Sequence, residues 1–263
     1  MPLGWWRRRQ RRKLLQRPIS PIWERELIKL PFVEALSSEQ RVRLVEIARV
    51  IAAEKRWEAC GGLEFSDAMP VVISLQAALL ILEIDHHYYR GVKSIFIYPS
   101  TYVRPQKTRA ESGDLQVILG EAWLRGPTVL AWDATKRGAY HPHDGRNLVW
   151  HEFSHKLDMR DGLIDGTPPL AKRSDYLEWR EVLSREFEAL KEDVQKGRRT
   201  VLDRYGTTNA PEFFAVSTEA FFEKGVRLKR KHPALYDTLR KYYRQDPAAW
   251  GRLSRYQEPR DEG

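Results

Sequence analysis

The sequence predicts an α+β fold, in which helices come first, a few short strands follow and helices return. Two patterns support this class: apolar residues recur at helical spacing near both ends of the chain, and short β-type runs separated by turn residues fill its middle. With 263 residues, 42% hydrophobic and 31% charged, the chain suits one globular core rather than a disordered or fibrous protein. We expect a basic N-terminal arm over 1–20, a single domain over 21–250 and a polar tail over 251–263.

The first half of the chain predicts a helical hairpin followed by a buried helix. Apolar spacing indicates helices over 23–34 and 38–60, and Ser37 or Ser38 is suited to cap the second. The apolar run over 71–84 is rich in leucine and alanine, which favours a buried helix over a strand.

The second half predicts a small sheet and then a helical region. Strands are expected over 94–98, 116–119 and 129–132. Helices are expected from Asn147 onward and near 174–195, 211–224 and 232–244, with a loop at 161–169.

The positive charge is concentrated in the arm. Seven basic residues precede the first acidic residue, Glu24, and without them the net charge of +9 falls to +2. The fold itself is therefore not basic in the manner of a nucleic-acid-binding domain. Together with Trp5 and Trp6, the arm could contact acidic lipid or nucleic-acid phosphate, although a frayed, solvated terminus explains it equally well. The seven are Arg7, Arg8, Arg9, Arg11, Arg12, Lys13 and Arg17.

The cysteine content restricts the chemistry. Cys60 is alone, so the chain forms no internal disulfide, and any metal must be bound by histidines and carboxylates. Because no apolar run follows the arginines, we expect neither a signal peptide nor a membrane span. These features predict a cytoplasmic protein.

A metal-binding motif lies in the apolar segment after Asn147. His151-Glu152-Phe153-Ser154-His155 has the pattern H-E-x-x-H, which on a helix places both imidazoles on one face, with Glu152 within reach of a metal-bound water. Two surface histidines on an amphipathic helix are the alternative. A catalytic zinc needs a third protein ligand, and spacing alone leaves several candidates open. These are Asp203, Glu212, Glu219, Glu223, His232, His141 and His143.

Three segments resemble one family. They are the HExxH motif extended to Lys156-Leu157-Asp158, the pairs Gly120-Glu121 and Gly126-Pro127 before the strand at 129–132, and Glu212-Phe213-Phe214-Ala215-Val216. Together these segments resemble the Mlc titration factor A family of bacterial zinc peptidases. The resemblance covers most of 20–250.

The resemblance implies a zincin-like metallopeptidase domain with a small sheet and an HExxH-bearing helix. Its active site is similar to that of the anthrax lethal factor catalytic domain, where a Glu-Phe-Phe-Ala segment supplies the third zinc ligand and a tyrosine seven residues earlier assists catalysis. By this resemblance Glu212 is the third ligand, Tyr205 assists catalysis, and Glu219 is left to orient a ligand histidine. The lethal factor segment has an acid where this chain has Val216.

The expected mechanism is hydrolysis by metal-activated water. Glu152 is the general base, and Tyr205, with Tyr140 as a second choice, donates a hydrogen bond to the oxyanion. The substrate is expected to lie extended along the strand at 129–132, and Asp158 to hold a ligand or cap a loop.

Two functions of different classes follow from the resemblance. The first is a zinc-dependent, aminopeptidase-like enzyme acting on small peptides, with a link to sugar-uptake genes through an Mlc-type repressor. The second is a non-catalytic protein that sequesters a transcriptional regulator. The intact Glu152 favours the enzyme, because pure binding needs no general base.

Overall fold

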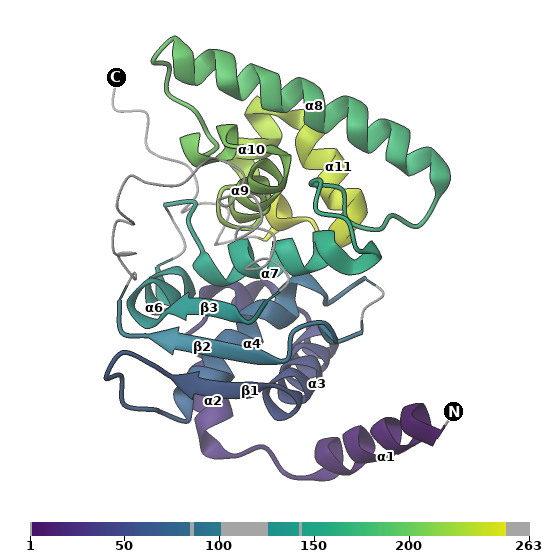
Figure 1. The fold of residues 1–263 in the computed structure, drawn as a ribbon, viewed down its shortest axis with the longest axis vertical. Coiled ribbons are helices and arrows are strands. Elements are labelled where there is room, and N and C mark those ends of the chain that lie inside the picture. The colour runs from purple at the N-terminus through teal and green to yellow at the C-terminus, as the bar shows by residue number, and fades with distance from the viewer. Residues whose placement is uncertain (1, 85–86, 101–125, 142–143, 251–263) are drawn as a thin grey trace, which may run out of the picture.

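A small parallel sheet lies against a larger set of helices in the computed structural model (Figure 1). The structure describes residues 2–84, 87–100, 126–141 and 144–250. Its longer helices are α1 (Pro2–Gln16), α2 (Pro21–Leu27), α3 (Ser38–Glu54), α4 (Ala68–Leu80), α6 (Trp132–Tyr140), α7 (Leu148–Asp158), α8 (Arg173–Gln195), α9 (Ala210–Glu223), α10 (Gly225–Lys231) and α11 (Pro233–Tyr243). Its strands are β1 (Arg56–Ala59), β2 (Ser94–Tyr98) and β3 (Thr128–Ala131), and its short 3₁₀ helices are η1 (Pro31–Ala35), η2 (Met159–Asp161), η3 (Arg204–Thr207) and η4 (Pro247–Ala249). This content agrees with the predicted α+β class.

The N-terminal arm is helical and attached to the domain, not frayed. Arg49 on α3 donates hydrogen bonds to the main-chain oxygens of Leu14 and Arg17, at 2.7 and 2.8 Å. Arg11 forms a bidentate ion pair with Glu54 at the end of α3, in which its Nε and Nη2 each donate to one carboxylate oxygen. These bonds fix α1 along one end of the molecule (Figure 1).

The predicted helix over 23–34 is wrong in its second half. Pro31 has no N–H and disfavours a helical residue before it, so Leu30 is extended (φ −89°, ψ 110°) and separates α2 from the 3₁₀ helix η1. The next helix, α3, begins with a capping box: Ser37 accepts from the Gln40 N–H, and the Gln40 side chain accepts from the Ser37 N–H.

The predicted helix over 38–60 is also too long. It ends at Glu54 because Lys55 is extended and its Nζ is held by the carbonyls of Tyr88 and Tyr89, at 2.8 and 2.7 Å. The following residues form β1, which pairs with β2. Local composition did not indicate this strand; its hydrogen bonds to β2 decide its conformation.

All three strands run parallel, in the order β1-β2-β3. Trp57 is opposite Ile95, and Phe96 is opposite Val129. The predicted strands at 94–98 and 129–132 are confirmed, except that Trp132 begins α6, which the sequence analysis missed. The predicted strand at 116–119 and the tail over 251–263 lie outside the described residues.

The predicted core helix is α4, which ends four residues before Ile84. From Val71 to Leu80 every residue of α4 is buried, because α2, α3, α6 and α7 pack around it. The helix lies in the middle of the molecule (Figure 1). On the far side of α7 lies α9, so α7 is enclosed between two apolar helices. This stacking positions the HExxH segment.

The C-terminal helices match the predictions closely. The expected helices at 174–195, 211–224 and 232–244 correspond to α8, α9 and α11, while the short α10 before His232 was not predicted. In the described part of the chain, every helix is too short or too polar to cross a membrane.

Candidate metal centre

The helix that carries the motif begins at a buried polar residue. The Asn147 side chain accepts a hydrogen bond from the Trp150 N–H at 3.0 Å and so caps α7, while its amide donates to Gln76 on α4. Gly138 makes room for this cap, since a Cβ there would lie 2.9 Å from the Asn147 side chain. Val149, Trp150 and Phe153 are buried, and α7 as a whole packs against α4 and α9. The histidines are thereby fixed on the remaining face.

The helix opposite has its own cap. The Asn209 side chain accepts from the Glu212 N–H at 2.9 Å, and Pro211 occupies the first turn, where its missing N–H costs nothing. Phe213 and Phe214 are buried. Glu212 is therefore held in the first turn of α9, facing α7.

His151, His155 and Glu212 form the site. Nε2 of His151 lies 2.9 Å from Oε2 of Glu212, and Nε2 of His155 lies 3.4 Å from the same oxygen. One ligand atom from each residue lies within 4.8 Å of the other two, so the three could hold one metal ion. Two imidazole nitrogens and one carboxylate are a donor set typical of catalytic zinc.

Glu219 holds the other side of the His151 ring. Its Oε1 lies 2.5 Å from Nδ1 of His151, and its Oε2 accepts from the Asn147 N–H at 2.8 Å. Both oxygens of Glu219 are engaged, whereas Nε2 of His151 points to Glu212. Glu219 thus links the orientation of His151 to the start of α7.

Two carboxylates flank the His151 imidazole and change its pKa. Burial alone would lower the pKa of His151, but hydrogen bonds to Glu212 and Glu219 outweigh burial and raise this pKa to about 10. Burial opposes ionisation of Glu212, yet its two histidines lower its pKa to about 2. For Glu219, burial dominates and raises the pKa. The two carboxylates thus favour the protonated form of His151, so binding of a cation at this cluster would compete with a proton.

Glu152 and Tyr205 border the cluster. Burial lowers the pKa of Lys156, and the Glu152 charge opposes this shift; the same charge contributes to the raised pKa of His151. The Tyr205 ring, on η3, is 53% exposed, and its centroid lies 5.9 Å from that of His151. Glu152 belongs to the motif itself, and Tyr205, which the family resemblance assigned to the site, lies beside His151.

The remaining candidate ligands have other partners. Asp203 pairs with Arg146 at 2.5 Å, and Nδ1 of His232 lies 2.8 Å from Glu186. Glu223 is buried and accepts from the N–H groups of Gly145 and Arg146; burial, together with the charges of Asp144 and Glu219, raises its pKa to about 8.

Among the upstream candidates, His141 lies just beyond α6 and outside the cluster, and His143 is outside the described residues. Tyr140, the second choice for the oxyanion, donates its hydroxyl to Glu26 at 2.9 Å instead.

Asp158 connects the end of α7 to the next loop. Its Oδ2 accepts from the Gly166 N–H at 2.9 Å, and burial raises its pKa to about 6. Its Oδ1 and Nδ1 of His155 are both buried without a hydrogen-bond partner within the described part of the chain. The loop-capping role expected of Asp158 is therefore observed.

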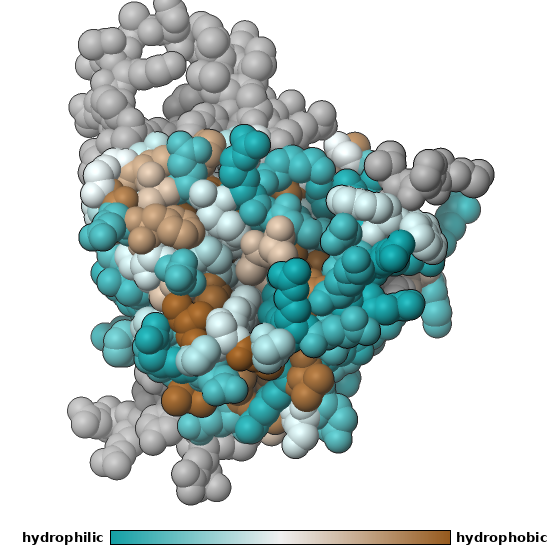
Figure 2. Space-filling model, turned by 90° about the horizontal axis from the view of Figure 1, so that it is seen from below, coloured by the Kyte–Doolittle hydropathy of each residue, from teal (hydrophilic) through white to brown (hydrophobic). Residues whose placement is uncertain are grey.

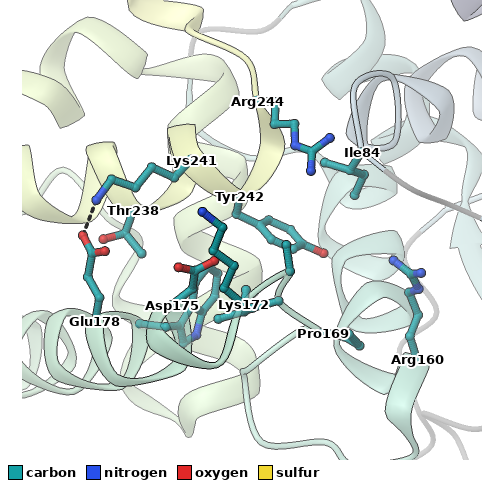
Figure 3. A pocket seen from close by; sticks show the side chains of 13 residues that line it. Ile84, Arg160, Pro169, Lys172, Asp175, Glu178, Thr238, Lys241, Tyr242 and Arg244 are labelled. Atoms are coloured by element: carbon teal, nitrogen blue, oxygen red, sulfur yellow. Dashed lines mark hydrogen bonds and ion pairs between the residues drawn. The ribbon is translucent and has the colours of Figure 1, made fainter.

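A cavity of about 460 Å³ lies beside the same end of α7 but is separate from the cluster (Figure 3). Arg160, Tyr242 and Arg244 line one side of it, and the ion pair of Lys241 with Glu178 lies at the other. None of the three cluster residues lines this cavity.

The comparisons with known proteins agree with this geometry. Residues 4–244 match the family model described as glucose-regulated metallo-peptidase M90. The chain belongs to this metallopeptidase family. One relative, an uncharacterised protein of Synechocystis, is 38% identical to this chain over 248 residues, which cover 92% of this chain and 89% of that protein.

Two further relatives of this M90 family chain are both called Mlc titration factor A, from Yersinia pestis and Yersinia pseudotuberculosis. Each is 31% identical over 239 residues, or 88% of this chain and 87% of the relative. The predicted resemblance to the Mlc titration factor A family is thereby confirmed.

Sequence reasoning missed the residues that support this M90 site. Asn147 and Asn209 cap the two helices, and Gln76 on α4 fixes the first cap. An asparagine just before an apolar helical run was a usable signal for each cap. Nothing local indicated Gln76, because its partner lies 71 residues away.

Proposed function

We propose that the chain is a zinc-dependent peptidase whose metal is held by His151, His155 and Glu212. The observation that carries this proposal is the convergence of both Nε2 atoms on the Glu212 carboxylate, in a chain of a metallopeptidase family. The donor set suits zinc, which takes three protein ligands at catalytic sites and keeps one position open. The zincin-like arrangement of sheet and motif helix is part of the same proposal.

The residues around the cluster have distinct tasks in this mechanism. Zinc, when bound, supplies Lewis acidity that polarises a carbonyl group and lowers the pKa of water toward about 7. The Glu152 carboxylate accepts the proton of the attacking water and then delivers it to the leaving amine. The Tyr205 hydroxyl donates a hydrogen bond to the carbonyl oxygen as negative charge develops there. Glu219 keeps the proton of His151 on Nδ1, which leaves Nε2 available as a ligand.

The proposed substrate is a small peptide, cleaved in an aminopeptidase-like reaction. This substrate class rests on the family resemblance. β3 packs beside α7, and within the described residues only β2 pairs with it. A substrate main chain could therefore pair with the other edge of β3 and pass the cluster.

The mechanism is tested with Glu152→Gln and a panel of aminoacyl and dipeptide chromogenic substrates. We expect the variant to keep its zinc and to lose at least about 100-fold in kcat, the usual contribution of a general base. Glu181→Gln, an exposed glutamate on α8, is the matched control and should hydrolyse like the wild type. Equal activity of Glu152→Gln and wild type would remove Glu152 from the reaction.

A second function is proposed because the named relatives are called Mlc titration factor A. We propose that the chain also binds an Mlc-type transcriptional repressor, which places it in the cytoplasm, as its lone Cys60 suits. Binding is measured with the purified repressor on a biosensor surface. Glu152→Gln should bind like the wild type if sequestration needs no catalysis, and absence of binding by both would contradict this second function.

A further inference from the structure

The proposed peptidase does not use the most unusual part of the sequence, the N-terminal helix. α1 and the residue following it carry six arginines and one lysine but no acidic residue. Arg11 is the one member with an ion-pair partner among the described residues, and that partner is Glu54. Like charges one turn apart on a helix repel one another, and an anion against the helix would relieve this repulsion.

Two exposed tryptophans lie near the start of α1, and the second, Trp6, also lines a hollow between α1 and the domain. Trp5 is 65% exposed and Trp6 is 57% exposed, and Arg9 lies over the Trp5 ring at 5.5 Å. Arg8 and Arg12 are exposed on the same helix, whereas Leu14 and Leu15 are partly covered by the domain. Tryptophans among cations are typical of helices that lie in a membrane interface.

Behind α1 lies a hollow of about 550 Å³ that is also basic. Its one acidic lining residue, Glu54, is already paired with Arg11. Burial, the largest effect, and the charges of Lys93, Arg11 and Arg7 together lower the pKa of Lys55 to about 8 against the opposing charge of Glu54. These cations are thus close enough to Lys55 to repel it. Besides Arg11, the basic residues that line the hollow are Arg7 and Lys13 on α1, Arg17 directly after it, and Lys55, Arg90 and Lys93 in the domain.

The chemistry that suits this hollow is a phosphate group. Phosphate oxygens accept hydrogen bonds from arginine and lysine and carry the charge that the hollow lacks. The exposed tryptophans beside the hollow favour a phospholipid over a free phosphate, because a membrane interface also takes up their rings.

The position of α1 suits attachment to a flat surface. α1 runs along one end of the molecule, and the sheet lies between it and α7 (Figure 1). Seen from that end, hydrophilic side chains are interspersed with apolar patches (Figure 2). A surface bound there would leave the contact between α7 and α9, with its histidines, facing away.

We propose that α1 and the hollow behind it bind the phosphate headgroups of an anionic phospholipid membrane, with Trp5 and Trp6 entering the interface. Binding is electrostatic and reversible, since two tryptophans provide little apolar area. It is independent of the metal site.

The test is co-sedimentation of the full-length protein with vesicles of phosphatidylcholine containing about 30% phosphatidylglycerol, against phosphatidylcholine alone. We expect binding to the anionic vesicles, weakened at least about tenfold as salt rises from about 50 to about 500 mM. One cation near an anionic surface contributes about fivefold, so Arg8→Glu with Arg12→Glu should reduce partitioning at least about 25-fold. Trp5→Ala with Trp6→Ala should weaken binding without changing its salt dependence.

The matched control is Lys172→Glu with Arg244→Glu, which reverses two cations beside the cavity of Figure 3. It should bind vesicles like the wild type. Equal loss in this control, or equal binding to neutral vesicles, would overturn the proposal.

Two competitors test the source of the phosphate. Millimolar inorganic phosphate should displace little protein from vesicles, and strong displacement would indicate a small-anion site instead. A single-stranded oligonucleotide that binds more tightly than the vesicles at equal phosphate concentration would assign the surface to nucleic acid. Circular dichroism confirms that each variant is folded.

Discussion

Separate removal of Glu212 and Glu219 distinguishes a metal ligand from the residue that orients one. The two acids lie two turns apart on α9 and contact opposite nitrogens of the same imidazole, at 2.9 and 2.5 Å. Glu212 also reaches His155, whereas the second oxygen of Glu219 is bound to Asn147. Glu212→Ala removes a donor atom from the cluster, and Glu219→Ala leaves all three donors in place.

The expected losses differ by about tenfold. Four-ligand structural zinc sites contribute about 10–16 kcal/mol of binding free energy, so one ligand is worth about 2.5–4 kcal/mol, or about 70- to 900-fold in Kd. Loss of a residue that orients a ligand histidine costs about 10- to 100-fold. Glu212→Ala should therefore bind zinc more weakly than Glu219→Ala, and both more weakly than the wild type.

The assay is a competition titration of zinc between each protein and a chelating dye. Glu186→Ala is the control, because Glu186 likewise holds a histidine, His232, but lies outside the cluster. Its zinc affinity should equal that of the wild type. If Glu219→Ala bound zinc more weakly than Glu212→Ala, the two roles would be exchanged, and the argument from geometry would be refuted.

Three other substitutions test the reaction and the fold. Tyr205→Phe should lower kcat about 100-fold, because loss of one hydrogen-bond donor to the oxyanion has an effect of this size, and should leave the zinc content unchanged. An unchanged kcat would show that Tyr205 takes no part in catalysis. Hydrogen bonds from Lys29, Tyr140 and Arg25 outweigh burial and lower the pKa of Glu26. The ionised carboxylate therefore stabilises the fold above about pH 4.5, and this stabilisation is lost as the pH falls through the lowered pKa. Urea unfolding of Glu26→Gln should thus show a deficit of about 1.5–3 kcal/mol at pH 7 that shrinks toward pH 3, and a deficit independent of pH would contradict the assignment. Gly166→Ala places a Cβ 2.6 Å from the Ala210 oxygen at φ +80° and should cost more stability than Gly162→Ala, where φ is +94° and no atom lies within 4 Å; equal losses in urea would show that contact with α9 is unimportant.

The fold could be predicted where the pattern was local. The apolar run of α4 and the apolar spacing of α8 and α9 are local signals, and each predicted helix lies near its observed bounds. β1 was missed because Arg56–Ala59 is half exposed and becomes a strand only by pairing with β2, nearly forty residues later. Pro31 predicts the break at Leu30, because a residue before proline avoids the helical conformation, but the apolar periodicity on both sides favours one continuous helix.

The sequence predicts the residues of the candidate metal site but not the long-range contacts that hold them in place. H-E-x-x-H determines that two histidines share a helix face, and the resemblance identified Glu212 and Tyr205, which lie beside them. Spacing alone did not separate Glu212 from Glu219, because both lie on one face of α9; the distinction appears only when α7 packs against it. The attachment of α1 through Arg49 depends on contacts 32 to 35 residues apart, which no local pattern reveals.

The proposed function requires that His151, His155 and Glu212 hold a zinc ion. Its most direct test is the zinc content per chain, measured by elemental analysis on purified wild type and on His155→Ala, because this measurement needs no known substrate. We expect about one zinc per chain in the wild type and much less in the variant, which should remain folded by circular dichroism. A wild type without zinc even after anaerobic reconstitution, or a His155→Ala variant that retains it, would contradict the claim.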